Sequence, residues 1–425
     1  MKNTFRICIL LLGFLCLWLD VSYAQETLTW EDCLIEAKKN NPDLISAAEG
    51  VNIKKAAKDI TASALYPQTS LNLSASTAKT STTSGSSTSD TYSYGASGTQ
   101  LIFDGFKTIN DLKSAEQDLK ASQHAYRFAS SEVRSKLRNA FINLLKAQEL
   151  IKVAEDIVKI RKNSLVLINL QYLSGLEHKG ALLTAEANLL QAKFELSQAK
   201  RNVEFTQRQL SEQMGRRNFK PIEVKGEFVV NETAKEKPDF EELVKNNPEV
   251  LEAILKENSK LFGIKSAYGN FSPQLTGSAG ANKKSGNWPP ENDNWNLGLS
   301  LTMPLFEGGL KAAELSQAKA TYEQAVADEV SIRSAAIVSL EQTWAALQDV
   351  IEEVEVQNKS LEASQERAEI AKAQYSNGFI SFDNLIIIED NLVGSKKAYL
   401  ESQANALTAE ADWIKAKGET LEYAQ

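Results

Sequence analysis

Four stretches of the chain alternate apolar and polar residues, which is the period expected of β-strands with two different faces. In the clearest one, Asn, Gly and Ser separate the apolar residues Trp295, Leu297, Leu299 and Leu301. The alternation predicts strands at about 68–79, 91–103, 274–282 and 295–305. A polar, turn-rich segment separates the two members of each pair, so the four strands are expected to form two hairpins.

The two faces of the predicted strands favour a membrane location. Each strand has about the length that a tilted strand needs to cross a bilayer, ~9–11 residues. The face with Trp295, Leu297, Leu299 and Leu301 would contact lipid, whereas the small polar residues opposite suit a water-filled lumen. The alternation alone leaves a soluble sheet open as the alternative.

Two much longer stretches, 107–172 and 310–377, contain neither proline nor glycine. Their apolar residues recur at three- and four-residue steps, which is typical of the seams between packed helices. Each stretch ends close to a glycine, Gly175 or Gly378, and a second helical pattern follows. Each is therefore predicted to form the first arm of an antiparallel coiled-coil hairpin.

These features occur twice, in the same order. Equivalent motifs recur at a nearly constant spacing: Asn41-Pro42 with Asn247-Pro248, Phe103-Asp104-Gly105 with Phe306-Glu307-Gly308, and Tyr172 with Tyr375. A helix opens each repeat, and the Asn-Pro pair marks a bend in it. The spacing divides the chain into a first repeat at 25–214, a linker at 215–238 and a second repeat at 239–425.

The first residues have the pattern of an export signal. Lys2 and Arg6 precede the apolar run from Ile7 to Leu19, and the small residues Ser22 and Ala24 follow it. The run is short for a spanning helix, which needs about 20 residues. We therefore expect residues 1–24 to be a cleaved signal peptide, with an uncleaved anchor as the alternative.

Composition excludes several classes of function. The chain has 47 Lys and Arg against 55 Asp and Glu, a net charge of −8, whereas nucleic-acid binders need a basic surface. It has 2 histidines and 3 cysteines, and it lacks nucleotide-binding, zinc and nucleophile-elbow motifs. We therefore expect no enzyme activity, no cofactor, no metal and no nucleic-acid partner.

Four strands cannot close a membrane barrel, because the smallest barrels have about eight. Open sheet edges cannot face lipid, since their backbone groups would lack hydrogen-bond partners. The chain is thus expected to share one barrel among copies, as a dimer or a trimer. The arrangement indicates a conduit. Two alternatives are a periplasmic adaptor and a secreted structural coiled-coil protein, although neither explains a duplicated chain with symmetric strand pairs.

The duplicated layout, the Asn-Pro bends, the Phe-Asp/Glu-Gly strand ends and the glycine breaks resemble the TolC family of outer-membrane efflux proteins. The resemblance implies a mainly α fold with a membrane β-barrel portion, in which three chains share a twelve-stranded barrel continuous with a periplasmic α-helical barrel. It also implies an exit duct in the cell outer membrane, for efflux or type I secretion. The implied partners are two further copies, outer-membrane lipid, a periplasmic adaptor and an inner-membrane pump of the RND or ABC type.

The resemblance also assigns roles to residues at the hairpin tips. The tips that dock the adaptor correspond to Ser174, Gly175 and Leu176 in the first repeat, and to Asn377, Gly378 and Phe379 in the second.

The family's periplasmic gate corresponds to Tyr375, with Asp383 and Asn384 expected at the narrowest point. This gate departs from the family pattern, because Ile380 replaces an arginine, and Gly180 and Ala181 replace polar partners. For Asp383, the cap of the restarting helix is an equally reasonable role.

Overall fold

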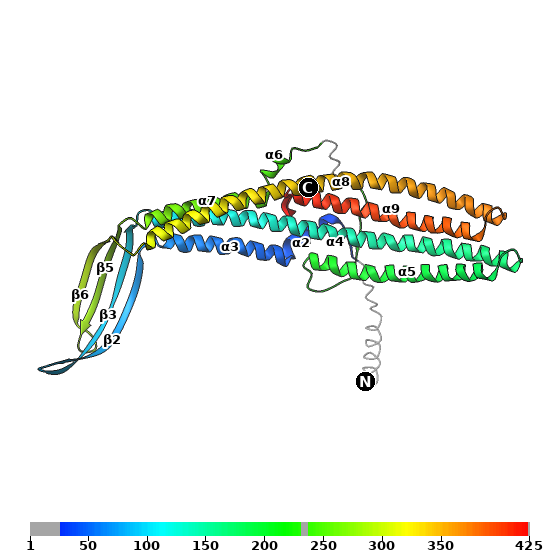
Figure 1. Cartoon of the computed structure of the whole chain (residues 1–425). Helices are drawn as coiled ribbons and strands as arrows, with labels where there is room; N and C mark the ends of the chain where they lie inside the picture. Colours follow the sequence, from blue (N-terminus) through cyan, green and yellow to red (C-terminus); the bar gives the residue numbers. More distant parts are fainter. Residues whose placement is uncertain (1–25, 231–236, 424–425) are drawn as a thin grey trace, which may run out of the picture. The chain divides into compact units, whose positions relative to one another are not determined.

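The computed structural model describes residues 26–230 and 237–423, so the predicted signal peptide lies outside the described residues (Figure 1). The chain divides into two structural units. The described part of the first unit comprises residues 26–37, 140–228 and 361–404. The second comprises the remaining described residues, and the two longest helices contribute to both.

Each repeat opens with a pair of helices instead of one bent helix. Helix α2 (Trp30–Asn40) ends before α3 (Pro42–Ser63), and α6 (Phe240–Val244) ends before α7 (Pro248–Gly269). The side chain of Asn41 accepts hydrogen bonds from the N–H groups of Asp43 and Leu44, at 3.0 and 3.1 Å. Asn247 caps α7 in the same way, with proline at the first helical position in both. The Asn-Pro pair therefore starts a new helix.

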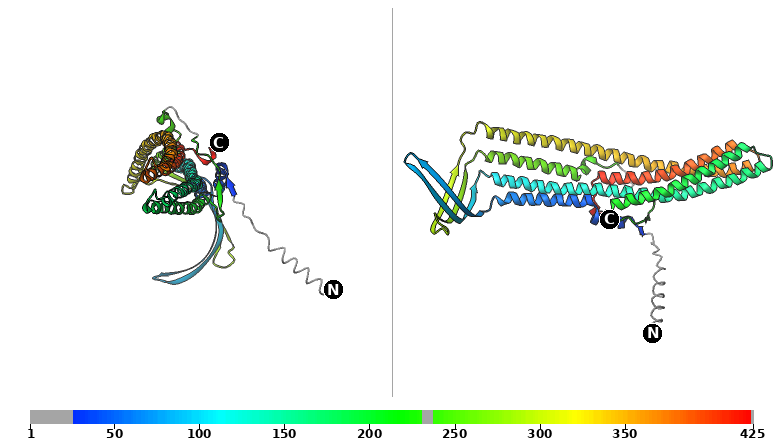
Figure 2. Two further views of the ribbon diagram at one scale, coloured as in Figure 1. Left: turned by 90° about the vertical axis from the view of Figure 1, so that its right-hand side faces the viewer. Right: turned by 90° about the horizontal axis from the view of Figure 1, so that it is seen from below.

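The second unit contains a four-stranded antiparallel sheet in the order β2-β3-β5-β6. Its strands are β2 (Gln68–Thr82), β3 (Gly85–Phe103), β5 (Gln274–Ser285) and β6 (Asn292–Thr302). The register places Leu71, Ala96, Ala281 and Trp295 in one row across the sheet. Because residues paired across antiparallel strands share a face, the predicted apolar face continues over all four strands. Figure 2 shows that the sheet is curved.

The strand limits differ from those predicted. Strands β2 and β3 extend almost to the hairpin tip, through a Ser/Thr-rich segment predicted to be a loop. This ribbon is held by backbone pairing and by side-chain bonds such as Thr77 Oγ1 to Asp90 Oδ1 at 2.7 Å. Strand β6 ends at Thr302, short of the predicted 305, because Pro304 has no N–H to donate.

The first unit contains the far parts of two helical hairpins. One joins α4 (Lys107–Leu173) to α5 (Lys179–Gln213), and the other joins α8 (Leu310–Ser376) to α9 (Phe382–Ala416), with the two side by side (Figures 1 and 2). Their shared core is formed by Ile168, Ala181, Ala185, Ala371, Tyr375, Phe382 and Leu385. Apolar residues of both long helices are buried in such cores, which confirms that their apolar stripes are packing surfaces.

The predicted linker contains one short strand, β4 (Ile222–Val224), which pairs in parallel with β1 (Glu26–Leu28) in the first unit. Arg216 fixes this corner by hydrogen bonds to Glu26 and Glu36, the latter at 2.6 Å from its Nε. In the second unit, α6 packs Phe240 and Val244 against Leu340 and Leu347 of α8. The short 3-10 helix η1 (Leu421–Tyr423) ends the described chain.

The predicted fold class is confirmed: the protein is mainly helical, with two antiparallel strand pairs in duplicated halves. Among the helices of the described ranges, none has an apolar stretch of the length and low charge needed to cross a lipid bilayer.

Candidate functional site: the two hairpin tips

The two hairpins end in the same backbone motif. At the first tip, the Gly175 N–H donates to the Tyr172 carbonyl at 3.0 Å and the Leu176 N–H donates to the Gln171 carbonyl at 2.9 Å. Gly378 and Phe379 repeat both bonds at the second tip, with distances of 3.0 and 2.9 Å. This is the Schellman motif, which requires a left-handed residue after the helix. Both glycines have φ of 75°.

The glycines are explained by this backbone conformation. A Cβ atom at Gly175 or Gly378 would meet no atom within 4 Å, so neither is needed for close packing within the chain. The tips instead project large apolar side chains into solvent. Leu176 is 75% exposed and Phe379 is 79% exposed. Each tip thus presents one apolar side chain on a fixed turn.

The helices that leave the tips start with different caps. His178 precedes α5, and its Nδ1 atom accepts the Ala181 N–H at 3.1 Å. Ser381 precedes α9, and its Oγ atom accepts the Asn384 N–H at 3.4 Å. The suggestion that Asp383 caps this helix is therefore wrong, because α9 has already begun at Phe382. Asp383 lies in the first turn, where a carboxylate interacts favourably with the helix dipole.

A hydrogen bond joins the two tips directly. The Tyr375 hydroxyl, from the last turn of α8, donates to Glu177 Oε2 at 2.8 Å. Tyr375 is only 5% exposed. Burial and the neighbouring Glu177 carboxylate raise the pKa of Tyr375 far above that of free tyrosine, so the phenol stays protonated and remains a donor. The predicted gate tyrosine thus holds the second hairpin to the first.

A groove of about 580 Å³ lies between the tips. Five of the predicted docking and gate residues line it: Leu176, Tyr375, Asn377, Gly378 and Asp383. Ser174, Gly175, Phe379 and Asn384 are not in its lining. Glu177 and His178 also line the groove, and the sequence reasoning assigned a role to neither. Their position between a glycine break and a restarting helix is a signal that could have identified them.

Below the tips, buried charges join the hairpins, and the sequence reasoning missed them as well. Arg161 of α4 is only 7% exposed, and it pairs with Glu389 at 3.0 Å and with Asp390, both on α9. Ser164 donates to the same Glu389 carboxylate. Burial raises the pKa of Glu389, although Ser164 and Arg161 oppose the shift. A polar cavity of about 420 Å³ lies beside this cluster.

The predicted lipid-facing residues lie in a row on β6. Trp295, Leu297 and Leu299 are 80%, 79% and 75% exposed, and Leu301 continues the row. Towards the hairpin turns, Tyr92 and Tyr94 of β3 contact the ring of Trp288. Aromatic side chains at the end of an apolar band are typical of a membrane–water interface.

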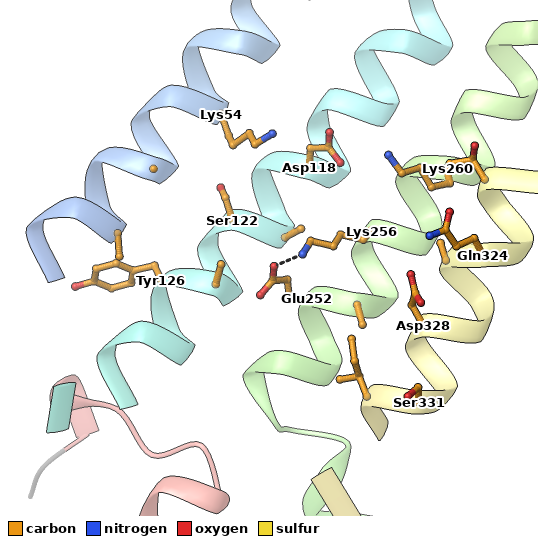
Figure 3. Close-up of a pocket in the computed structure, with 18 residues that line it drawn as sticks. Lys54, Asp118, Ser122, Tyr126, Glu252, Lys256, Lys260, Gln324, Asp328 and Ser331 are labelled. Atoms are coloured by element: carbon orange, nitrogen blue, oxygen red, sulfur yellow. Dashed lines mark ion pairs between the residues drawn. The ribbon is translucent and has the colours of Figure 1, made fainter. Parts of the chain in front are cut away.

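A second groove, of about 800 Å³, lies among α3, α4, α7 and α8 in the second unit. Figure 3 shows Lys54, Asp118, Lys256 and Lys260 around it, with Lys256 paired to Glu252 at 2.5 Å. Lysines and carboxylates are equally numerous in its lining, so the groove favours neither sign of charge. In residues 26–230 and 237–423, no three His, Cys, Asp or Glu side chains are placed to hold a metal ion.

The sequence matches one protein family over both repeats. The family described as outer membrane efflux protein matches residues 34–216 and 240–421. A relative is the probable outer membrane lipoprotein SilC of Salmonella typhimurium, 23% identical over 376 residues, which are 86% of this chain and 80% of SilC. The outer membrane efflux protein BepC of Brucella suis is 21% identical over 93% of this chain and 86% of BepC.

A solved structure shares the fold. The CmeC outer membrane channel of Campylobacter jejuni superposes with a TM-score of 0.79 at 20% identity, over 92% of this chain and 85% of CmeC. The chain belongs to the outer membrane efflux protein family. It is an efflux channel of the outer membrane and not an enzyme, which confirms the predicted class. Members of this family form trimeric channels in tripartite pumps.

Proposed function

We propose that the chain forms a homotrimeric exit duct and that its hairpin tips both close the duct and dock a periplasmic adaptor that links it to an inner-membrane pump. The proposal rests on the structure of the hairpin tips. Each one presents an exposed apolar side chain on a rigid turn, Leu176 or Phe379, which is an arrangement suited to a partner helix. The Tyr375–Glu177 bond, which ties the two tips together, supplies a closed resting state.

The sheet supports the trimer. In the single chain, β2 and β6 are the edges of the sheet, and their free backbone groups need partners in lipid. Antiparallel pairing of β6 with β2 of the next copy continues the apolar face without interruption. Three copies then provide twelve strands. Within the same proposal, residues 1–24 are removed on export, and 215–238 link the repeats 25–214 and 239–425.

Membrane placement is tested on β6. Leu299→Arg should cost about 2–4 kcal/mol because it buries a charge in lipid, whereas Ser300→Arg, one residue further and on the other face, should fold normally. The measurement is heat-resistant trimer in purified outer membranes, together with the mass of the detergent-solubilised particle. A stable monomer, or equal tolerance of both arginines, would contradict the proposed barrel.

Docking is tested at the second tip. Phe379→Asp should abolish export and cross-linking to the adaptor while the trimer assembles, because the exposed ring makes no core contact. Phe379→Leu should retain most export. Ser360→Asp adds the same charge at an exposed position of α8 outside the tip, and it serves as the control. Normal export by Phe379→Asp would remove the tip from the docking surface.

A further inference from the structure

The first tip carries a titratable helix cap that the second tip lacks. His178 is one of the chain's 2 histidines, and its Nδ1 atom accepts the Ala181 N–H at 3.1 Å. The equivalent residue of the second repeat is Ser381, whose hydroxyl caps α9. An imidazole can take up a proton and become a cation, whereas a serine hydroxyl cannot. The start of α5 can therefore respond to protonation of its cap, whereas the start of α9 cannot.

The cap requires a neutral imidazole. In the neutral ring one nitrogen can accept a hydrogen bond, whereas in the protonated ring both nitrogens are donors. A protonated His178 would direct an N–H at the Ala181 N–H and place a positive charge at the positive end of the α5 dipole. Protonation must therefore break the Nδ1 bond and move the ring away from the helix.

The Glu177 carboxylate lies beside this ring. Its Oε1 atom accepts the backbone N–H of His178 at 3.0 Å and lies 3.7 Å from His178 Nε2. Its Oε2 atom accepts the Tyr375 hydroxyl at 2.8 Å. A protonated imidazole would attract the same carboxylate that holds Tyr375. The cap and the bond between the hairpins are thus coupled through one side chain.

Four charged or titratable groups of the described residues lie next to His178 in the sequence or line the same groove. Glu177 precedes it in the loop, and Lys179 follows it in α5. Tyr375 of α8 and Asp383 of α9 line the same groove. Glu177 is close enough to attract a protonated ring, since its Oε1 atom lies 3.7 Å from His178 Nε2.

We propose that His178 is a positioning residue: its neutral ring caps α5 and leaves Glu177 bound to the Tyr375 hydroxyl, whereas its protonated ring leaves the cap and competes with that hydroxyl for the Glu177 carboxylate. The tips then separate more readily at pH 5.5 than at pH 7.5. The inference deepens the proposed closure at the tips and depends on it for its effect on transport.

Hydrogen exchange of the full-length protein tests the switch without any assay of transport. After correction for the intrinsic rate, peptides at the start of α5 and over Tyr375 should exchange roughly 2- to 30-fold faster at pH 5.5 than at pH 7.5, the range expected for loss of an N-cap. The start of α9, capped by Ser381, should show no change. His178→Ser, which copies the second tip, should abolish the response, and His124→Gln should retain it.

Single-channel conductance in planar bilayers tests the consequence. Wild-type channels should open more often at pH 5.5, His178→Ser should be insensitive to pH, and His178→Ala should open more often at both values. An unchanged pH response of exchange in His178→Ser would overturn the inference. A pH-dependent exchange without any change of conductance would support the switch and contradict the proposed closure at the tips.

Discussion

The two hairpin tips have the same backbone and different chemistry. Both helices end at a left-handed glycine with the same pair of hydrogen bonds, and in both repeats the next helix starts four residues after that glycine. The side chains between these points have diverged: Glu177 corresponds to Ile380, His178 to Ser381, and Gly180 to Asp383. The duplication has therefore kept what the turn requires, namely glycine and a cap, while the groups available for closure differ.

The difference makes the two tips complementary. The first supplies the acceptor, Glu177, and the second supplies the donor, Tyr375, from the helix before its turn. The second tip also contributes Phe382 to the shared core. Because Tyr172 is the counterpart of Tyr375, the tips differ in the acceptor, where Ile380 replaces Glu177, and not in the donor.

The largest effect is expected where a buried charge joins the hairpins. Arg161→Met should lower the free energy of unfolding by about 3–5 kcal/mol at pH 7.5, because it leaves the Glu389 carboxylate buried without its cation. The pKa of Glu389 is already raised in the folded protein. The contribution of this carboxyl to folding stability is therefore present at low pH and is lost as the pH rises through the raised pKa. The cost should therefore shrink towards pH 5 in denaturant titrations.

The double variant Arg161→Met, Glu389→Leu separates charge burial from packing. It should be close to wild type or more stable by about 1–4 kcal/mol, since apolar pairs often replace buried ion pairs without loss. A double variant as unstable as Arg161→Met would show that the shape of the side chains, and not an unpaired charge, determines how much this contact between α4 and α9 contributes to stability.

The bond between the tips should have the next largest effect. Tyr375→Phe removes a hydrogen bond to a carboxylate, which is worth about 1.5–3 kcal/mol, and keeps the ring in the core. Because the pKa of Tyr375 is raised, the contribution of this bond should be complete below about pH 10 and lost as pH rises through the raised value. Tyr375→Phe should lack this alkaline phase in tyrosine absorbance and in melting temperature.

Substitution of the glycine in either turn is expected to have the same effect on stability. Gly175→Ala and Gly378→Ala should each cost about 1–2 kcal/mol, because a Cβ atom is unfavourable at positive φ even in open space. Thermal unfolding of the two variants should give similar shifts. A cost at one tip only would mean that the repeats do not use their glycines for the same purpose.

The smallest effect concerns the second cap. Ser381→Ala should cost about 1 kcal/mol by removing the acceptor for the Asn384 N–H. Ser381→Asp should restore the loss, since aspartate is an equally good cap. Hydrogen exchange at the start of α9 provides the measurement, and an unchanged rate in Ser381→Ala would mean that the long 3.4 Å bond contributes little.

Much of the fold could be predicted because its signals are local. Alternation identified all four strands, and the absence of breakers identified α4 and α8. The limits were missed where side chains give no periodic signal, as in the Ser/Thr-rich segment from Thr80 to Asp90. The Asn-Pro pair was interpreted as a bend within one helix. Asn41 and Asn247 can act as caps only when the preceding helix ends, and that end was not predicted.

The site was less predictable because it depends on contacts between the repeats. Tyr375 was found through its resemblance to a family residue, but its acceptor lies in the other hairpin, far away in sequence. Arg161 and Glu389 occur on helices rich in charged residues, and their burial follows only from packing. The alternative role of Asp383 as the cap of α9 was wrong by two positions, because the residue before a helix depends on where the turn places its first N–H group.

The unpaired edges of the sheet have a consequence for how the channel is made. A single copy of the chain has two open strand edges and an exposed apolar face, β6 and its row of leucines among them. Completion of the proposed trimer requires three copies to meet, so its rate must fall steeply as the copies become scarce. The same edges can pair with the wrong chain in the interval. The yield of channel therefore depends on the relative rates of assembly and aggregation. A carrier protein that shields β2 and β6 would favour assembly.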